Sequence, residues 1–209
     1  SKPDLRTGRE AAEYAAEIRR IMRYLGVSDG NMQEGSLRCD VNISVRPTVN
    51  DPFGTKVEIK NMNSFSAIQK ACEYEIKRQI KVYESGEDVK QETRLWDEGK
   101  QLTKSMRSKE GSSDYRYFPD PDLGPIEVSH DLKEKWRSEL PELPAAKRNR
   151  YASELGLSIY DARVLTDESS MAIYFEKVVN EGGAAKSSAN WITGDCLLYT
   201  SPSPRDWLQ

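Results

Sequence analysis

The stretch Ser36-Leu-Arg-Cys-Asp-Val-Asn-Ile-Ser-Val-Arg46 alternates strictly between polar and apolar residues. Its even-numbered positions are polar, and its odd-numbered positions, from Leu37 to Val45, are apolar. A period of two places successive side chains on opposite faces of a β-strand. The stretch therefore predicts a strand with one buried face and one polar face.

A second alternating stretch, Thr55–Lys60, follows a loop that runs from Pro47 to Gly54. The two stretches predict an antiparallel hairpin with a longer loop, because alternating runs on either side of a Gly- and Pro-containing segment are typical of that motif. Two more short strands are predicted at 93–96 and 101–106, on either side of the turn Asp97-Glu-Gly-Lys100.

Helical patterns surround these strands. Thr7-Gly-Arg-Glu10 has the spacing of a capping box, and apolar residues follow at helical intervals as far as Leu25. A second helix is predicted to be capped by Asn63 or Ser64 and to end near Gly86. From Ser129 onward only helical patterns occur. They predict helices at 131–140, 144–155, 158–165, 166–180 and 184–193.

The sequence thus predicts an α+β fold whose composition changes near residue 140. We expect a sheet-containing part at 1–140 and an all-α part at 141–195. The segment 196–209 has two prolines and no periodicity, and it is either a flexible tail or translated vector sequence. Re-reading the coding sequence across the Asp195 codon distinguishes these. Because the first residue is Ser1, we expect the natural start to lie upstream.

Composition excludes several classes of protein. There are 31 Lys and Arg against 34 Asp and Glu, a net charge of −3, so a globally basic nucleic-acid binder is excluded and any RNA contact needs a local patch. Three scattered cysteines without CxxC spacing argue against a zinc site or a disulfide framework and favour reduced, intracellular thiols. No apolar run approaches a membrane span, and no P-loop or Rossmann glycine motif occurs.

The polar face of the predicted hairpin is the sharpest functional feature. Its row consists of Arg38, Asp40, Asn42, Ser44 and Arg46 beside Lys56, Glu58 and Lys60. Sequence pattern alone favours a solvated, salt-bridged face, because exposed ion pairs are common and contribute little stability. Three further observations favour a binding site instead.

First, the row contains acidic, amide and basic side chains together. Carboxylates suit Mg²⁺, and arginine and lysine bind phosphate. Second, the row leads into Lys60-Asn-Met-Asn-Ser64 at a helix N-terminus, where anions are favoured. Third, more arginines follow in the next extended segments: Arg94, Arg107 and Arg116. The row spans roughly 26 Å, which is too long for one small ligand, so the site is predicted at its centre. The central residues are Arg38, Asp40, Asn42, Glu58 and Lys60.

Four blocks in order resemble the B subunit of the Asp/Glu-tRNA amidotransferases and its archaeal E-type relative. They are Glu34-Gly-Ser-Leu-Arg-Cys-Asp40, Phe53-Gly-Thr-Lys-Val-Glu-Ile-Lys-Asn61, Gln91-Glu-Thr-Arg94 and Asp114-Tyr-Arg-Tyr-Phe-Pro119. Pro141-Glu-Leu-Pro144 and Asn190-Trp191 are similar to the start of that family's helical domain. The resemblance runs from Ser1 to about Asp195.

The resemblance implies a glutamine-synthetase-like cradle on an antiparallel sheet, followed by a helical domain. It implies an ATP-dependent carbon–nitrogen ligase with glutamine as amido donor. ATP and Mg²⁺ would phosphorylate the carboxylate of glutamate on tRNA(Gln), or of aspartate on tRNA(Asn). Ammonia from an amidase (A) subunit would then displace the phosphate, in a heterotrimer with a small C subunit. The compartment would be the bacterial cytoplasm, or the mitochondrial or plastid matrix in a eukaryote.

The resemblance also implies residue roles. The catalytic residues would be Asp40, Glu58, Arg38 and Lys60, and the metal ligands Glu34 and Asp40. Substrate and ATP would be bound by Asn42, Lys56, Asn61, Arg94, Arg107 and Arg116. The family's N-terminal cradle part, the rest of its helical domain and its tail domain have no counterpart here, so the chain alone is expected to be inactive. The alternative is a non-catalytic RNA- or protein-binding module with a charged sheet face.

Overall fold

The computed structural model describes residues 2–106 and 122–196, in two compact units. One unit comprises Ser1–Ile18 and Gly30–His130, and the other comprises Arg19–Asp29 and Asp131–Gln209. The first helix therefore contributes its N-terminal part to the first unit and its C-terminal part to the second. The division at residue 140 into a cradle part and a helical part stays a prediction.

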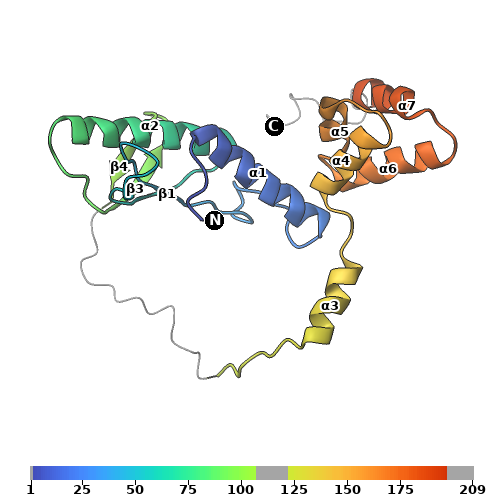
Figure 1. The fold of residues 1–209 in the computed structure, drawn as a ribbon, viewed down its shortest axis with the longest axis horizontal. Coiled ribbons are helices and arrows are strands. Elements are labelled where there is room, and N and C mark those ends of the chain that lie inside the picture. Colours follow the sequence, from blue (N-terminus) through green and yellow to red (C-terminus); the bar gives the residue numbers. More distant parts are fainter. Residues whose placement is uncertain (1, 107–121, 197–209) are drawn as a thin grey trace. The chain divides into compact units, whose positions relative to one another are not determined.

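In its described residues, the sheet-containing unit has the N-terminal part of the first helix, the whole of a second helix and four strands (Figure 1). Its elements are α1 (Gly8–Tyr24), β1 (Val41–Ile43), β2 (Val57–Lys60), α2 (Phe65–Glu84), β3 (Thr93–Asp97) and β4 (Leu102–Ser105). Each corresponds to a predicted element. The strands lie in the order β1-β2-β3-β4 in one sheet.

The prediction of an antiparallel sheet is wrong at its centre. The β1–β2 and β3–β4 pairs are antiparallel, whereas β2 and β3 are parallel, with Glu58 opposite Thr93. The physical reason is the connection: α2 joins β2 to β3, and a helical crossover returns the chain to run in the same direction. The structure is thus mixed α/β, and the glutamine-synthetase-like cradle stays a prediction.

The first strand is also shorter than predicted, because its flanks find other hydrogen-bond partners. Only Val41–Ile43 pairs with β2, instead of the whole of 36–46. Before it, the Ser36 backbone N–H donates to the Asn31 carbonyl at 2.9 Å. After it, Arg46 Nη1 donates to the Asp51 carbonyl at 2.9 Å and closes a loop. The polar row is therefore not one continuous strand.

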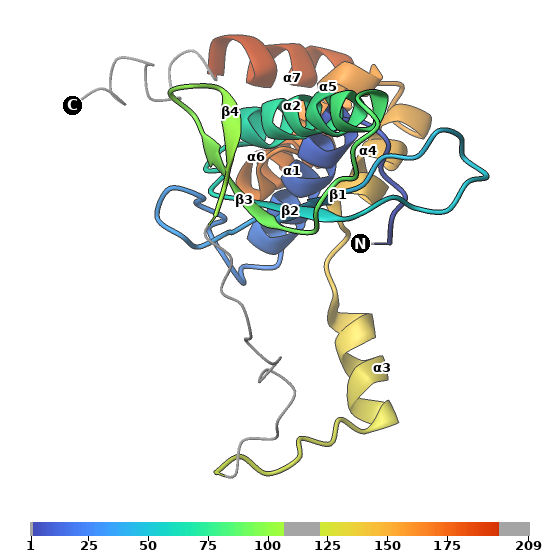
Figure 2. The ribbon, with the colours of Figure 1, turned by 90° about the vertical axis from the view of Figure 1, so that its left-hand side faces the viewer.

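One face of the sheet is covered by α2, which lies along it in both views (Figure 1, Figure 2). Val57 and Ile59 of β2 are completely buried, and so are Ile68 and Ala71 of α2. Trp96 of β3 belongs to the same core. The opposite face of the sheet is exposed.

The N-terminus of α1 packs very closely on α2, and Gly8 permits this approach. A Cβ atom at position 8 would lie 2.5 Å from the Gln69 carbonyl oxygen, which no side chain tolerates without movement of the backbone. Ala12 and Ala15, further along α1, are buried in the core that α2 shares with the sheet. Small residues on one side of α1 thus set the spacing of the two helices.

The predicted starts of α1 and α2 are confirmed, whereas α6 (Ser169–Asn180) begins at Ser169 and not at the predicted Thr166. The Glu10 backbone N–H donates to Thr7 Oγ1 at 3.1 Å, and the Thr7 backbone N–H donates to Glu10 Oε2 at 3.1 Å, which completes the capping box. Of the two candidates for the α2 cap, Ser64 is the residue used: its Oγ accepts the Ala67 backbone N–H at 3.0 Å.

Substitution Ser64→Ala is expected to lower the free energy of unfolding by about 1 kcal/mol, because it leaves the Ala67 N–H without its side-chain acceptor. Urea denaturation of the chain, followed by circular dichroism, measures the effect. Ser66→Ala, at an exposed position in the first turn of the same helix, is the matched control and should change stability by less than half as much. Equal effects of the two substitutions would show that the cap contributes nothing particular.

A buried ionic network joins α2 to β3 and β4. Glu75 is completely buried, and its carboxylate accepts hydrogen bonds from Arg78 Nη2 at 2.6 Å, Gln79 Nε2 at 3.0 Å and Thr103 Oγ1 at 3.0 Å. Arg94 Nε lies 3.6 Å from the same carboxylate. Gln79 also donates to the backbone of β1. Glu75 of α2 is thereby linked directly to β3 and β4, and through Gln79 to β1.

Among the described residues of the second unit the regular elements are all helical, as predicted for 131–195. It contains α3 (His130–Glu139), α4 (Pro144–Ser153), α5 (Ile159–Leu165), α6 (Ser169–Asn180), α7 (Ala185–Trp191) and the π-helical turn η2 (Ile192–Cys196). Tyr151, Leu165 and Phe175 are completely buried in its core. The rings of Tyr151 and Phe175 meet edge to face with centroids 5.0 Å apart.

The C-terminal part of α1 binds within this helical unit. Arg20 Nη2 lies 2.8 Å from Asp167 Oδ1, and Tyr24 Oη donates to the Thr166 carbonyl at 3.0 Å. Burial raises the pKa of Tyr24 to about 12, so the hydroxyl keeps its proton and remains a donor. No helix of residues 2–106 and 122–196 combines the length and the hydropathy needed to cross a membrane.

Candidate functional site

The exposed face of the sheet carries two acids around one base. Lys60 Nζ lies 3.6 Å from Asp40 Oδ2 and 3.7 Å from Glu58 Oε1. We call these three residues the acid–lysine cluster. Their side chains are 41, 48 and 34% exposed for Lys60, Asp40 and Glu58, so a ligand can reach all three.

Three neighbouring strands hold this cluster in place. Asn42 of β1 stands directly opposite Glu58 of β2, on the exposed face. From the other side, Thr93 Oγ1 of β3 donates to Glu58 Oε2 at 2.9 Å. The structure therefore brings together four of the predicted residues: Asp40, Asn42, Glu58 and Lys60.

Two carboxylates of the cluster are too few to hold a metal ion alone, so a metal here would need phosphate oxygens to complete its coordination. Mg²⁺ in nucleotide sites is held by one or two carboxylates together with phosphate oxygens, and lysine supplies a point charge to phosphate. Asp40, Glu58 and Lys60 match that donor set. In the part of the chain that the structure describes, no group of three or more His, Cys, Asp and Glu could hold a metal ion. The exposed pairs contribute little stability themselves, so they can rearrange around a ligand.

Three other predicted residues lie near the cluster in sequence and are exposed. Arg38 and Lys56 have no ion-pair partner among residues 2–106 and 122–196. Glu34 lies in a turn, directly before Gly35, and the backbone φ angle of Gly35 is +83°. The role of Glu34 as a metal ligand stays a prediction.

The structure does not bring Arg94 to the cluster. Its neighbours Thr93 and Leu95 stand beside Glu58 and Lys60 of the exposed face, and Arg94 therefore faces α2. There its Nε donates to Thr103 Oγ1 at 2.8 Å within the buried ionic network. The other two predicted arginines, Arg107 and Arg116, lie outside the described residues.

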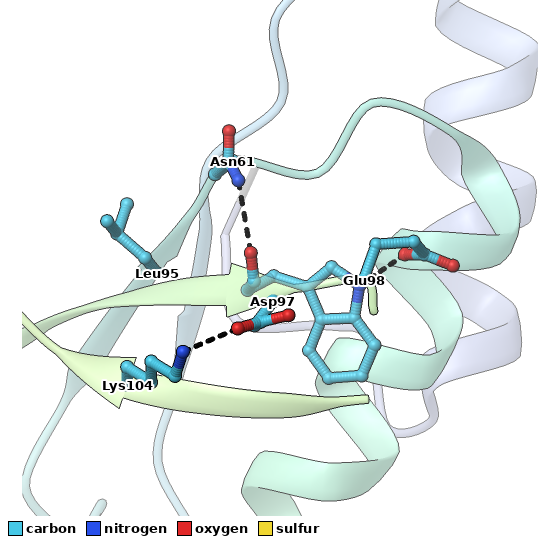
Figure 3. A pocket seen from close by; sticks show the side chains of 6 residues that line it. Asn61, Leu95, Asp97, Glu98 and Lys104 are labelled. Carbon is cyan, nitrogen blue, oxygen red and sulfur yellow. Dashed lines mark hydrogen bonds and ion pairs between the residues drawn. The ribbon is translucent and has the colours of Figure 1, made fainter. Parts of the chain in front are cut away.

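A shallow cavity opens beside the cluster, where β2 and β3 end (Figure 3). Because the two strands are parallel, their carboxyl ends meet at one edge, which is where ligands bind in many α/β sheets. The cavity holds about 310 Å³ and is lined by Asn61, Leu95, Trp96, Asp97, Glu98 and Lys104. Asn61 follows β2 with φ of +70°, and its Nδ2 donates to the Trp96 carbonyl at 3.1 Å. Asparagine tolerates this left-handed backbone better than most residues.

The cavity is lined by two carboxylates, Asp97 and Glu98, which are both engaged by neighbouring donors. Lys104 Nζ lies 2.5 Å from Asp97 Oδ2, and this hydrogen bond, helped by the Lys100 backbone N–H, lowers the pKa of Asp97. A hydrogen bond from Trp96 Nε1, at 2.5 Å, likewise lowers the pKa of Glu98. Both carboxylates are therefore charged at neutral pH, and each has a lysine partner: Lys104 for Asp97 and, at 3.9 Å, Lys70 for Glu98.

Sequence reasoning named Asn61 but missed Leu95, Asp97 and Lys104. The signal was present, because Trp96 is the largest apolar residue of its strand and marks the buried face. Its neighbours Leu95 and Asp97 must then point to the exposed face.

Comparison with known proteins gives one family. The family model described as "GatB/GatE catalytic domain" matches residues 1–134. The B subunit of aspartyl/glutamyl-tRNA(Asn/Gln) amidotransferase from Prochlorococcus marinus (strain NATL1A) is 94% identical over 199 residues, covering 95% of this chain and 40% of the relative. The protein of the same name from Synechococcus sp. (strain CC9605) is 85% identical over 201 residues, covering 96% and 41%. The chain thus spans about two fifths of the length of these relatives.

Proposed function

Because the chain belongs to the GatB/GatE catalytic domain family, we propose that it is part of the B subunit of an aspartyl/glutamyl-tRNA amidotransferase that acts in translation. The observation that carries this proposal beyond family membership is the acid–lysine cluster on the exposed sheet face. The reaction is the ATP-dependent conversion of the side-chain carboxylate of tRNA-bound glutamate or aspartate to an amide. ATP would supply the phosphoryl group that makes this carboxylate reactive and would leave as ADP, Mg²⁺ would neutralise the phosphate charge, and ammonia would release the group as inorganic phosphate.

The residues of the chain contribute binding and charge rather than covalent chemistry. Asp40 and Glu58, with the Asn42 amide beside them, are the groups that would hold Mg²⁺. Lys60 would bind a phosphate oxygen, and its two ion pairs would exchange for that contact. Phosphoryl transfer depends on positioning and on neutralising negative charge, and this set of donors supports both.

Two exposed cations flank the cluster and complete the proposal. Arg38 and Lys56 are available for the phosphates or for the carboxylate of the tRNA-bound amino acid. The nitrogen would arrive as ammonia from an amidase subunit, with a small C subunit as the third partner. Both relatives come from bacteria, and we place the reaction in the bacterial cytoplasm.

The test uses a full-length subunit carrying these residues, assembled with its amidase and C subunits. We expect ADP formation that depends on Glu-tRNA(Gln) and Mg²⁺. Asp40→Ala should lower its rate at least tenfold and leave tRNA affinity unchanged, because it removes a metal-binding carboxylate and no tRNA contact. Asp88→Ala, an exposed acid in the loop before β3, is the matched control and should retain full activity.

Unchanged turnover of Asp40→Ala would mean that the cluster is only a solvated, ion-paired face. In that case the chain would be a docking module for RNA or protein, and the chemistry would belong to other parts of the subunit. Loss of tRNA binding together with activity would also favour the docking module.

A further inference from the structure

Thr93 is held in place by backbone hydrogen bonds on both sides of β3. Toward β2, the Glu58 backbone N–H donates to the Glu92 carbonyl at 3.1 Å. Toward β4, the Met106 backbone N–H donates to the Thr93 carbonyl at 2.9 Å. In the parallel register Thr93 stands opposite Glu58, and its half-buried side chain lies on the exposed face of the sheet. Its hydroxyl is therefore presented to the acid–lysine cluster by an ordered strand.

The two oxygens of the Glu58 carboxylate have different partners. Oε2 accepts the Thr93 hydroxyl at 2.9 Å, whereas Oε1 lies 3.7 Å from Lys60 Nζ. A free glutamate side chain samples many rotamers, and fixing it costs conformational free energy when a ligand binds. The hydrogen bond at Oε2 restricts those rotamers beforehand, so Oε1 is the oxygen left to face the proposed metal and phosphate position.

We propose that Thr93 is a positioning residue for the phosphorylation step, because its hydroxyl orients the Glu58 carboxylate so that Oε1 can bind Mg²⁺. This role rests on the proposed function and deepens it, since Thr93 acts through Glu58 and needs no contact with ATP or with the amino acid. It also divides the stretch 91–94 between two tasks. Thr93 supports the exposed face, whereas Arg94 belongs to the buried ionic network.

Metal binding without turnover is the first measurement. The assembled amidotransferase is dialysed to equilibrium against Mn²⁺ and a non-hydrolysable ATP analogue, which supplies the phosphate oxygens, and the metal retained by the enzyme is measured. Thr93→Val keeps the shape of the side chain and removes the hydroxyl. We expect it to raise the Kd for Mn²⁺ about tenfold, the low end of the effect of removing a partner that orients a metal-binding group. Thr93→Ser keeps the hydroxyl and should bind Mn²⁺ almost as tightly as the unaltered enzyme.

ADP formation as a function of Mg²⁺ concentration is the second measurement. Thr93→Val should raise the Mg²⁺ concentration that gives half the maximal rate about tenfold and leave the KM for Glu-tRNA(Gln) unchanged. In a Glu58→Ala background, the same substitution should cause no further loss, because Thr93 acts only through that carboxylate. Thr48→Val, the same change at an exposed position of the hairpin loop, is the matched control and should alter neither measurement.

The positioning role is overturned by an unchanged Kd for Mn²⁺ in Thr93→Val, by an equal loss in Thr93→Ser, or by a further loss in the Glu58→Ala background. Asp40→Ala separates this role from the proposed function. If Asp40→Ala loses Mn²⁺ binding and ADP formation while Thr93→Val keeps both, the positioning role alone falls. If the unaltered enzyme forms no ADP with Glu-tRNA(Gln), the proposed function falls and the positioning role falls with it.

Discussion

Glu75→Ala is expected to lower the free energy of unfolding by about 3–5 kcal/mol, the cost of removing one partner from a buried ion pair. The carboxylate is completely buried and accepts hydrogen bonds from α2 and β4. Without it, Arg78 loses its bidentate partner, and that same hydrogen bonding is what raises the pKa of Arg78 in the native structure. Arg94 retains its ion pair with Glu92, and this remaining pair compensates only in part for the loss of Glu75.

Urea titration of the chain, with the fluorescence of Trp96 and the other tryptophans as the signal, measures this loss. Glu73→Ala is the matched control: the same substitution on the same helix, at an exposed position, should cost less than about 0.5 kcal/mol. Glu75→Gln keeps the shape and loses the charge, so an intermediate value is expected. A value for Glu75→Ala as small as that of the control would contradict the network's contribution to stability.

Lys60→Ala is expected to lower kcat/KM of the assembled amidotransferase by about 100- to 1,000-fold, the range found for removing one charge-stabilising donor from an active site. In the structure, Lys60 Nζ is within 4 Å of two carboxylates, beside the proposed metal ligands. The substitution removes the positive charge that the proposal assigns to a phosphate oxygen.

Tests with two further variants separate charge from shape. Lys60→Arg keeps the positive charge and should retain part of the activity. Lys90→Ala, an exposed lysine in the loop before β3, controls for general loss of positive charge and should be fully active. An equal loss in Lys60→Ala and Lys90→Ala would place the phosphate-binding charge elsewhere.

Local signals in the sequence predicted the local structure well. The capping box at Thr7–Glu10 and the cap of α2 depend on side chains within three residues of the groups they bind, so spacing alone identifies them. The start of α4 is also identified by a local signal. Pro144 occupies the first helical turn, where its missing N–H is not needed.

Pairing between distant strands was the part that the sequence did not determine. Alternation shows which residues share a face of a strand, but it does not show whether the neighbour runs parallel or antiparallel. β2 and β3 each alternate as a hairpin strand would, and only the helix between them indicates the parallel pairing. The assignment of Arg94 to the site has the same origin, because its face was judged without reference to Trp96.

The sequence predicted that four residues at the centre of the candidate site lie together, and it did not predict the residues at the margin. Asp40, Asn42, Glu58 and Lys60 meet because the hairpin register brings them together, and a strand period of two is enough to foresee that. Leu95, Asp97 and Lys104 join the surface through the order of all four strands, which no single stretch of sequence contains.

The parallel pairing of β2 with β3 also bears on the order in which the chain folds. Glu58 and its partner Thr93 are separated by 35 positions, whereas Asn42 and Glu58 are separated by only 16. Closing the longer loop costs more chain entropy, and α2 must form within it before the two strands can meet. We therefore expect the surface that joins Lys60 to Leu95 to be completed after the hairpin and the helix.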